Sequence, residues 1–397
     1  MYALNSAIQD VAAPPIAAVH EWVAGRTYPA DRPLLDVAQA VPVEPPPAAL
    51  RESVAAALVA HGAHRYTPIA GLPELREALA AHMSAQYDGN IRADDTVITA
   101  GCNQAFCLTV KALAAPGEAI VLPEPYYFNH QMWLEMCGIE VQRVPFAPER
   151  RGVPDVDSFA AAMTPATRAI AVVSPNNPTG AVYDAEHLEA LFELAQRHRV
   201  ALILDETYKD FHPASPAAPH KLFRRADWRG TLVQLFSFSK SYALTGYRVG
   251  SVIAGPELVR ETTKIQDCVN ICAPRLSQLM ALEAIRTLAP YVRHESALMR
   301  VRVEALKAAF AGIGNGRPGG FELVASGAWF AYVRHPFRDR DSTEVARYLA
   351  EEHGVLCVPG EVFGEAQRDY VRFAFANLAA DEMPALIARL ATAGAGH

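Results

Sequence analysis

The sequence predicts an α/β fold in which helices wrap a mainly parallel sheet, followed by a smaller α+β domain. Six short apolar runs lack polar alternation, which is typical of strands buried on both faces. Helical stretches separate most of these runs, and strands that alternate with helices form parallel sheets. After about residue 290 the pattern changes to a long helix and short mixed strands. We therefore expect a large domain over residues 46–289 and a second domain formed by residues 1–45 with 290–397.

The first 45 residues are rich in proline and predict an extended arm that leads into a helix. Pro47 suits the first turn of that helix, "AALRESVAAALVAHG", and Gly62 is its expected C-cap. His61 and His64 then lie at its C-terminal end, where a cation suits the helix dipole. A second amphipathic helix, "GLPELREALAAHMSAQYDG", has the same kind of glycine stop.

The apolar runs of the expected sheet follow these helices. They are "TVITAG", "AIVLPEP", "RAIAVVSP", "ALILDE", "TLVQLFSFS" and "RVGSVIAG". The helices expected between them lie in "NQAFCLTVKALAA", "HQMWLEMCG", "DSFAAAMT" and "DAEHLEALFELAQRHR". In the second domain, a helix through "ALMRVRVEALKAAFAGI" precedes the short strands "WFAYV", "GVLCVP" and "YVRFAFA" and two further helices.

Composition excludes several classes of function. The chain has 397 residues with 51% hydrophobic and 20% charged residues, a globular composition, and its net charge of −7 argues against nucleic acid as the main partner. No apolar run reaches 18 residues and the N-terminus has no basic region, so we expect neither a membrane span nor a signal peptide. Six scattered cysteines without a CxxC pair predict reduced thiols in the cytoplasm and no zinc or other metal site.

Two familiar motifs fail on their context, and a third does not occur in the sequence. "GNGRPG" (314–319) matches the dinucleotide fingerprint literally, but it follows a helix and contains Pro318, so we interpret it as a turn. "LILDE" (202–206) resembles the acidic strand end of P-loop ATPases, but the chain has no matching phosphate-binding loop. The G-x-S-x-G elbow of the hydrolases is also absent from the sequence.

Polar residues gather where the expected strands end. The first strand ends in Gly101, Cys102 and Asn103 at a helix start, where free N–H groups favour a phosphate. Others end in "PNNPTG" (175–180) and in Asp205 with Tyr208 three residues on. A further strand delivers Ser237, Ser239 and Lys240, and Arg248 starts the next one. Since the carboxyl ends of parallel strands meet at one edge, we expect these groups to share a single ligand site.

These groups suit a pyridine aldehyde phosphate. A lysine forms a Schiff base with the aldehyde, and burial with a cationic neighbour such as Arg248 lowers its pKa toward the reactive neutral amine. The carboxylate of Asp205 would keep the ring nitrogen protonated, so that the ring accepts electrons. The phenol and an amide would hold the ring oxygen, while Ser237 and Arg248 clamp the phosphate.

Five motifs in order resemble the class I/II aminotransferases, the pyridoxal-phosphate enzymes of fold type I. They are "YTPIAGLPELREAL", "NNPTG", "LDETY", "SFSKSYALTGYRVG" and "YVRFAFAN", and the resemblance runs from about residue 35 to the C-terminus. It implies that Lys240 is the lysine that carries pyridoxal 5'-phosphate and that Asp205 is the partner of the pyridine nitrogen. Tyr208 and Asn177 match the pair that bonds the ring hydroxyl.

The resemblance implies roles for further residues. Ser237 and Arg248 match phosphate ligands, as do Gly101, Cys102 and Asn103 at the helix start. Tyr127 sits where the family stacks an aromatic ring on the cofactor, and Arg372 matches the arginine that grips the α-carboxylate of the substrate. Tyr66 matches a tyrosine that reaches the phosphate of the neighbouring subunit, so a homodimer with shared active sites is implied.

The chain departs from the family's pattern at two places. Members often carry a glycine near the active-site opening, within "GEP", that approaches the substrate carboxylate. The equivalent stretch here is "LLDVAQAVP", with Ala40 in that place. Cys102 stands where small residues are usual, and the role of its thiol is open.

The expected reaction is transfer of an amino group from an L-amino acid to a 2-oxo acid in two half-reactions, with Lys240 as base and then acid. A β-elimination (C–S) lyase would use the same Lys240 and Asp205, so the motifs leave that alternative open. A regulator built on this fold would carry an added DNA-binding domain, for which the short arm leaves no room. The sequence does not identify a second arginine that would bind a carboxylate in the side chain of the substrate, although Arg26 and Arg275 are candidates. The apolar "YYFNHQMW" favours substrates with neutral or aromatic side chains.

Overall fold

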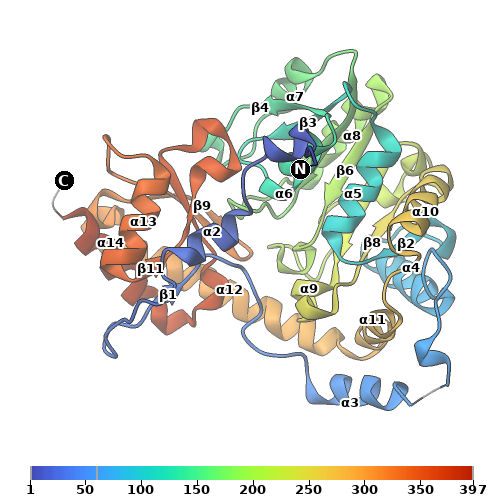
Figure 1. The fold of residues 1–397 in the computed structure, drawn as a ribbon, viewed down its shortest axis with the longest axis horizontal. Coiled ribbons are helices and arrows are strands. Elements are labelled where there is room, and N and C mark those ends of the chain that lie inside the picture. Colours follow the sequence, from blue (N-terminus) through green and yellow to red (C-terminus); the bar gives the residue numbers. More distant parts are fainter. Residues whose placement is uncertain (1, 60, 396–397) are drawn as a thin grey trace.

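The computed structural model describes residues 2–59 and 61–395. A seven-stranded sheet with the order β2-β8-β7-β6-β5-β3-β4 occupies the larger part of the molecule (Figure 1). Its strands are β2 (Thr96–Thr99), β3 (Ala119–Pro123), β4 (Glu140–Val144), β5 (Thr167–Val173), β6 (Ala201–Asp205), β7 (Leu232–Ser237) and β8 (Gly250–Ile253).

The sheet is mainly parallel, as the sequence predicts. The pairs β3–β4, β3–β5, β5–β6 and β6–β7 are parallel. Strand β8 runs antiparallel to both β7 and β2. The connection from β7 to β8 holds only the short helix α9 (Phe238–Ser241) and a turn, whereas a parallel pairing needs a longer crossover.

Helices cover both faces of this sheet, which explains the unbroken apolar runs. Leu202 and Leu204 face a core shared with α3 (Ala48–Ala57), α4 (Pro73–Tyr87), α7 (Val156–Ala162), α8 (Ala185–His198) and α11 (Arg275–Thr287). Ile203, between them, faces a core shared with α5 (Cys102–Leu113), α6 (Phe128–Met136) and α10 (Pro256–Asn270). Successive side chains of a strand point to opposite faces of the sheet. Because helices cover both faces here, the side chains on both faces must be apolar.

Strand β4 is the exception, and the sequence pattern missed it. Its residues, "EVQRV", alternate in burial from exposed Glu140 to buried Val144. It lies at the edge of the sheet and pairs only with β3 among the described strands. An edge strand with one exposed side carries polar residues, so no continuous apolar run marks it.

A second, antiparallel sheet lies apart from the first, with the order β12-β13-β10-β9. Its strands are β9 (Glu322–Gly327), β10 (Phe330–Arg334), β12 (Val358–Pro359) and β13 (Tyr370–Phe373). The helices α12 (Ala289–Ala311), α13 (Ser342–His353) and α14 (Met383–Gly394) contribute to its apolar core. Figure 1 shows β9, α13 and α14 in orange and red on one side of the molecule, while α12 runs from there toward α11.

The N-terminal arm joins the two parts, and it is less extended than the sequence predicts. It contains α1 (Ser6–Gln9) and α2 (Pro15–Glu21), and β1 (Leu35–Asp36) pairs in parallel with β11 (Val355–Leu356). Helix α1 packs against α6, while α2 packs against β12, so α2 lies between the two sheets (Figure 1). Prolines at 14 and 15 begin α2, because proline suits a first helical turn.

Two helix ends differ from the sequence prediction. Helix α3 ends at Ala57 with Leu58 as its C-cap, so the prediction of Gly62 was wrong. Helix α3 buries only Leu50 and Val54, and because most helical stability comes from packing, this small contact stabilises only a short helix. His61 and His64 belong to a separate 3-10 turn, η1 (His61–His64), so the prediction that they end this helix was also wrong.

Helix α4 ends at Tyr87, two residues before the expected glycine, Gly89. Its C-cap is Asp88, which adopts a left-handed conformation with a φ of 48°. Aspartate tolerates this region better than most residues, because its short side chain can hydrogen-bond locally.

Candidate active site

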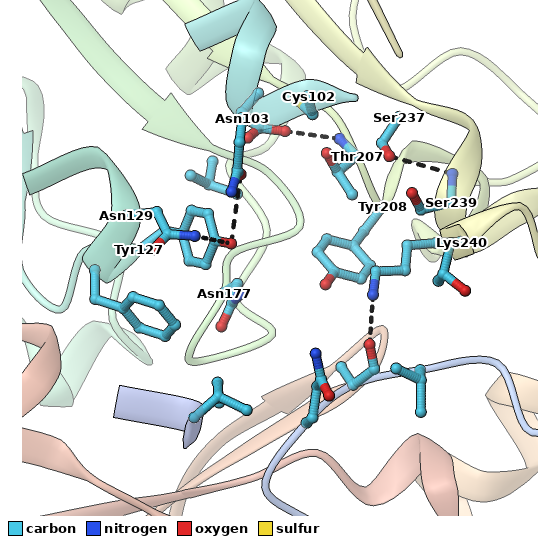
Figure 2. A pocket seen from close by; sticks show the side chains of 18 of the residues that line it. Cys102, Asn103, Tyr127, Asn129, Asn177, Thr207, Tyr208, Ser237, Ser239 and Lys240 are labelled. Carbon is cyan, nitrogen blue, oxygen red and sulfur yellow. Dashed lines mark hydrogen bonds between the residues drawn. The ribbon is translucent and has the colours of Figure 1, made fainter. Parts of the chain in front are cut away.

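The candidate site is a cavity of about 500 Å³ where β5, β6 and β7 end and α5 begins. This volume lies in the usual range of ligand sites, ~300–1,000 Å³. Figure 2 shows Lys240 and Tyr208 on one side of it and Asn103, Tyr127 and Asn129 on the other. The lining residues are Pro14, Ile16, Gln39, Ala40, Val41, Cys102, Asn103, Tyr127, Phe128, Asn129, Val173, Asn177, Asp205, Thr207, Tyr208, Ser237, Ser239, Lys240, Thr245, Arg248 and Arg372.

Lys240 lies in the short helix α9, whose N-cap is Ser237. Its Nζ donates a hydrogen bond to the carbonyl of Ala40 and lies 5.2 Å from the ring centroid of Trp329 (Figure 2). Burial, followed by the charges of Arg372 and Arg248, lowers the pKa of Lys240 to about 7. A large fraction of this amine is therefore neutral near pH 7, the form that acts as a nucleophile or base.

Asp205 ends β6 and is 5% exposed. The N–H of Thr207 donates to its Oδ1 at 2.9 Å, and Nε2 of His130 lies 3.5 Å from its Oδ2. Burial raises the pKa of Asp205, but His130 and Thr207 outweigh it and leave the pKa below its ordinary value. Asp205 thus presents a buried carboxylate to the cavity, suited to a cationic partner.

His130 is a site-related residue that the sequence reasoning missed. It lies in α6, and its ring stacks on Phe106 with centroids 3.8 Å apart and an interplanar angle of 14°. This stack directs the ring toward Asp205. A single histidine in an apolar helical stretch carries no signal of its own in the sequence.

The start of α5 forms a cup that suits a phosphate. The first N–H groups of a helix lack intrahelical partners and attract anions. Gly101 is the N-cap with a φ of 88°, and a side chain there would collide with the guanidinium of Arg248. At Gly250 a Cβ would lie 2.7 Å from the carbonyl carbon of Gly101. Both glycines therefore allow the backbone and Arg248 to close around the cup.

Hydroxyl groups complete this cup. The N–H of Ser239 donates to Oγ of Ser237 at 3.2 Å, and Nη1 of Arg248 donates to the carbonyl of Thr245 at 3.1 Å. Thr207, Ser239 and Thr245 line the cavity as well. Of these three residues, only Ser239 was predicted from the sequence to lie at the site, and Thr207 and Thr245 were missed.

Two tyrosines face each other across the cavity. The hydroxyl of Tyr127 donates to Oδ1 of Asn103 at 3.5 Å and accepts from Nδ2 of Asn129 at 2.8 Å. Tyr208 packs edge-on against Phe330, with ring centroids 5.2 Å apart. Burial raises the pKa of both phenols, so both stay protonated donors at neutral pH.

Arg372, on β13, reaches the cavity from the second sheet and is 2% exposed. Its Nη1 donates to Oδ1 of Asn177 at 3.1 Å and its Nη2 to the carbonyl of Ala38. Its Nε is buried and has no hydrogen-bond partner among the described residues. Burial lowers its pKa to about 10, so it remains a cation at neutral pH. A buried cation with an unused donor suits a carboxylate ligand.

One backbone segment, residues 36–41, contacts both of these cations; we call it the clamp segment. Its carbonyl at Ala38 accepts from Arg372, and its carbonyl at Ala40 accepts from Lys240. Nδ2 of Asn377 fixes the segment by donating to the carbonyls of Asp36 at 3.0 Å and Gln39 at 2.7 Å. Ala40, the position that departs from the family's glycine, therefore lies at the centre of the site.

Some predicted residues lie outside the cavity. Gly101 is in the adjacent turn that precedes α5. Tyr66 is 75% exposed and lines a separate surface groove with Arg275, whose Nη1 donates to the carbonyl of Tyr66 at 3.5 Å. Arg26 pairs with Glu351 at 2.9 Å. Neither of the two candidate arginines lines the cavity.

Two kinds of feature are absent from the part of the chain that the structure describes. No three histidine, cysteine, aspartate or glutamate side chains there gather in a way that could hold a metal ion. None of the helices within residues 2–59 and 61–395 is long and apolar enough to cross a membrane.

Comparison with known proteins agrees with this geometry. The model of the family "Aminotransferase class I and II" matches residues 33–390. The chain is 31% identical to the aromatic aminotransferase ISS1 of Arabidopsis thaliana, over 82% of this chain and 80% of that protein. It is 30% identical to the aspartate/prephenate aminotransferase of Thermus thermophilus, over 83% of each chain.

Solved structures show the same fold. The aspartate aminotransferase from Thermus thermophilus with maleate superimposes with a TM-score of 0.88 at 27% identity, covering 99% of this chain and 100% of that one. The mainly parallel sheet with flanking helices is thus the fold of that enzyme class. The chain belongs to the class I and II aminotransferase family. It is an aminotransferase, as the sequence motifs predict.

Proposed function

We propose that the cavity around Lys240 and Asp205 binds pyridoxal 5'-phosphate and serves the transfer of an amino group from an L-amino acid to a 2-oxo acid. The observation that carries this proposal is the pairing of a lysine of lowered pKa with a buried carboxylate in one cavity. Perturbed titratable groups that converge in a cleft are typical of active sites. The family match adds support, because class I and II aminotransferases use this cofactor.

The residues of the cavity fit the parts of this cofactor. Asp205 offers a carboxylate for a protonated ring nitrogen, and Tyr208 with Asn177 offers donors for the ring hydroxyl. Tyr127 offers a ring face on the opposite wall. The phosphate would lie at the start of α5, among Cys102, Asn103, Ser237 and Arg248. The absence of side chains at Gly101 and Gly250 allows the backbone and Arg248 to approach this cup closely.

When bound, the cofactor supplies an electrophilic aldehyde and a ring that accepts electrons. Lys240 would hold the cofactor through Nζ and, as a neutral amine, move the proton at the α-carbon of the substrate. Ala40 receives a hydrogen bond from Nζ and so fixes the starting position of the amine. Asp205 would keep a proton on the ring nitrogen, aided by His130.

Arg372 would bind and orient the α-carboxylate of the substrate. Its Nη atoms are held by Asn177 and Ala38, and its Nε is left with no partner among the described residues. The rings of Phe330 and Phe363 lie 5.2 and 5.3 Å from the guanidinium and keep water away from it. A charge-assisted pair in such a dry site is stronger than the same pair at the surface.

We further propose a homodimer in which Tyr66 reaches the phosphate of the neighbouring subunit. Tyr66 is 75% exposed, and Val59 and Leu58 nearby in the chain are 89% and 43% exposed. Large apolar side chains exposed together favour an interface between subunits. Replacing Tyr66 by Phe should weaken cofactor binding without changing the molar mass, measured by light scattering after gel filtration.

We propose that the protein works in the cytoplasm, since all six cysteines are free thiols. We propose that residues 46–289 form the cofactor-binding unit and residues 1–45 with 290–397 the second unit. Limited proteolysis followed by mass spectrometry of the fragments would test these boundaries.

The test of the reaction uses the purified protein loaded with pyridoxal 5'-phosphate. We expect amino groups to be transferred to an added 2-oxo acid, and we expect no reaction beyond one turnover when the 2-oxo acid is left out. Steady release of pyruvate and ammonia without any acceptor would contradict transamination and favour a β-elimination lyase instead.

A further inference from the structure

Part of the cavity wall lies beyond the groups proposed for the cofactor. Pro14 and Ile16 come from the N-terminal arm, Gln39 and Val41 from the clamp segment, and Phe128 from α6. Asn129 follows Phe128 and also lines the cavity. This wall, which we call the arm wall, is available to the side chain of a substrate.

The arm wall is apolar and held by packing. Ile16 and Phe128 belong to one hydrophobic cluster that also contains Val19 and Phe363. The ring of Phe128 lies 5.8 Å from that of Phe363. The polar members of the wall, Gln39 and Asn129, are neutral amides, and Nδ2 of Asn129 already donates to Tyr127.

Every cation that this chain contributes to the described lining of the cavity already has a proposed role, so this chain has none left for a second carboxylate. Among the described lining residues, the cations are Lys240, Arg248 and Arg372. Arg248 lies at the phosphate cup, Lys240 at the reacting centre, and Arg372 is proposed for the α-carboxylate. A side-chain carboxylate against Ile16 and Phe128 would lose its hydration without gaining a charged partner from this chain, which is costly.

The position of the arm wall is coupled to the rest of the site. The ring of His20 bonds the carbonyl of Ile16 at 2.7 Å and Oδ2 of Asp36 at 3.0 Å. Asp36 also accepts from the N–H of Ala38 at 3.0 Å, and the carbonyl of Ala38 accepts from Arg372. Ile16 is thereby tied to the clamp segment that holds the proposed α-carboxylate site.

We propose that the amino-acid substrate carries a single carboxylate and a neutral apolar side chain, aliphatic or aromatic, that packs on Ile16 and Phe128. This inference rests on the proposed function and narrows it to a substrate class. It separates this chain from the relatives named aspartate aminotransferases, whose named substrate carries a second carboxylate.

The first experiment compares substrates on the wild-type holoenzyme. L-Leucine and L-phenylalanine should convert the cofactor, followed by its visible absorbance, at least about tenfold faster than L-aspartate and L-glutamate at equal concentration. By calorimetry, 3-phenylpropanoate should bind at least about tenfold tighter than succinate. Equal or faster reaction of the dicarboxylic amino acids would overturn the inference while leaving the proposed function intact. Failure of every amino acid to react would instead contradict the proposed function.

A second experiment tests the arm wall itself. Ile16→Lys places a cation in the wall and should raise the glutamate-to-phenylalanine rate ratio at least about tenfold. The matched control is Ala17→Lys on the exposed side of α2, which should leave the ratio unchanged. A folded Ile16→Lys enzyme with the wild-type ratio would overturn the placement of the side chain on this wall. If Ile16→Lys does not fold, the ligand comparison on the wild type alone decides.

Discussion

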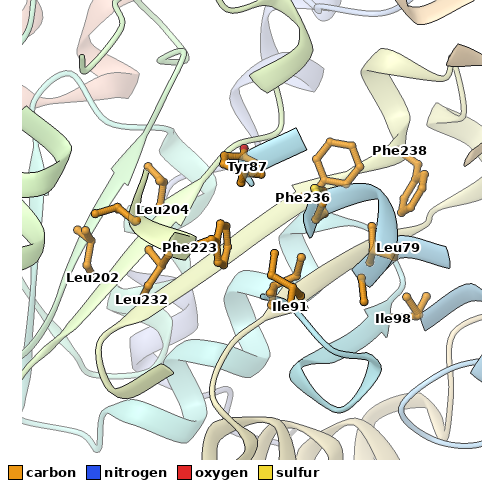
Figure 3. Close-up of a cluster of buried hydrophobic side chains, with 14 of the residues drawn as sticks. Leu79, Tyr87, Ile91, Ile98, Leu202, Leu204, Phe223, Leu232, Phe236 and Phe238 are labelled. Atoms are coloured by element: carbon orange, nitrogen blue, oxygen red, sulfur yellow. The ribbon is translucent and has the colours of Figure 1, made fainter. Parts of the chain in front are cut away.

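Two carboxylates that follow each other at the end of β6 lie in opposite environments. Asp205 faces the cavity, with the N–H of Thr207 and His130 beside it. Glu206 is fully buried on the other face of the sheet, where it accepts from the hydroxyl of Tyr87 at 2.7 Å and lies 3.3 Å from Nε2 of His220. Tyr87 itself lies in the apolar core among Phe223 and Phe236 (Figure 3).

The same contrast holds for two lysines. Lys209 is fully buried, and its Nζ donates to Oδ1 of Asp210 and to Oε1 of Gln86, both at 2.7 Å. Lys240 donates instead to a neutral backbone carbonyl and faces open space in the cavity. Burial alone therefore does not mark a catalytic group. A buried charge with its partner in place stabilises the fold, whereas one aimed at a cavity is available for chemistry.

The largest expected effect separates the two lysines. Lys240→Ala should reduce transamination by at least about 10²–10⁴-fold, because the proposed base is removed, and leave the free energy of unfolding unchanged or slightly higher. Lys209→Met should leave turnover nearly unchanged but lower the free energy of unfolding by about 3–5 kcal/mol, since it leaves Asp210 buried without its cationic partner. Urea unfolding and turnover of the folded fraction measure both. If Lys240→Ala retained its turnover, Lys240 would not be the base and the contrast between the two lysines would be wrong.

The two carboxylates offer the next test. Asp205→Asn should reduce turnover about 10²-fold or more, the scale of losing one electrostatic stabiliser in an active site. Glu206→Gln keeps the size of the side chain but weakens its charged hydrogen bonds, so it should lower the free energy of unfolding by about 1–3 kcal/mol. Its turnover should stay within a few-fold of the wild type. Similar losses of turnover in both variants would contradict the claim that only Asp205, which faces the cavity, takes part in the reaction.

The pKa of Lys240 predicts a pH dependence for the cofactor-free protein. The neutral amine is the reactive form, so its fraction falls as pH drops below about 7. The rate of combination with pyridoxal 5'-phosphate should therefore rise about tenfold per pH unit below that value and level off above it. Stopped-flow absorbance measures this profile. Arg372→Met removes one cause of the lowered pKa and should move the midpoint upward; an unchanged midpoint would exclude that cause.

The smallest effect concerns the His20–Asp36 pair at the edge of the site. Burial lowers the pKa of His20, but the carbonyl of Ile16 and the carboxylate of Asp36 outweigh it and raise the pKa overall. The pair is therefore fully formed below pH 6.5 and is lost as pH rises through the raised value. Both side chains are partly exposed, so the pair is worth at most about 1 kcal/mol. His20→Ala should raise KM about two- to fivefold with kcat unchanged. A KM equal to that of the wild type below pH 6 would contradict a role for this pair.

The sequence predicted the parts of the site that rest on side chains at strand ends. The short strands that end in Asp205 and Ser237 appear as unbroken apolar runs, and the polar residues follow them directly. Because parallel strands end at the same edge, motifs far apart in the chain could be joined into one site from the sequence alone. The cavity indeed contains Lys240, Asp205 and Arg372 together.

The remaining parts could not be predicted, for physical reasons. The contacts of Lys240 and Arg372 with the clamp segment use backbone carbonyls, which every residue has. His130 reaches Asp205 only because it stacks on Phe106 from another helix. The helices of the N-terminal arm are short, and their place depends on contacts with distant elements such as β12 and α6. None of these features leaves a periodic pattern in the sequence.

The most direct test of the central claim is to locate the lysine that carries the cofactor. The holoenzyme is reduced with borohydride, digested, and the labelled peptide identified by mass spectrometry. We expect the label on Lys240 alone, with Lys209 unmodified because its amine is already paired inside the fold. A label on Lys209 or any other lysine, or no label in a fully loaded enzyme, would contradict the assignment.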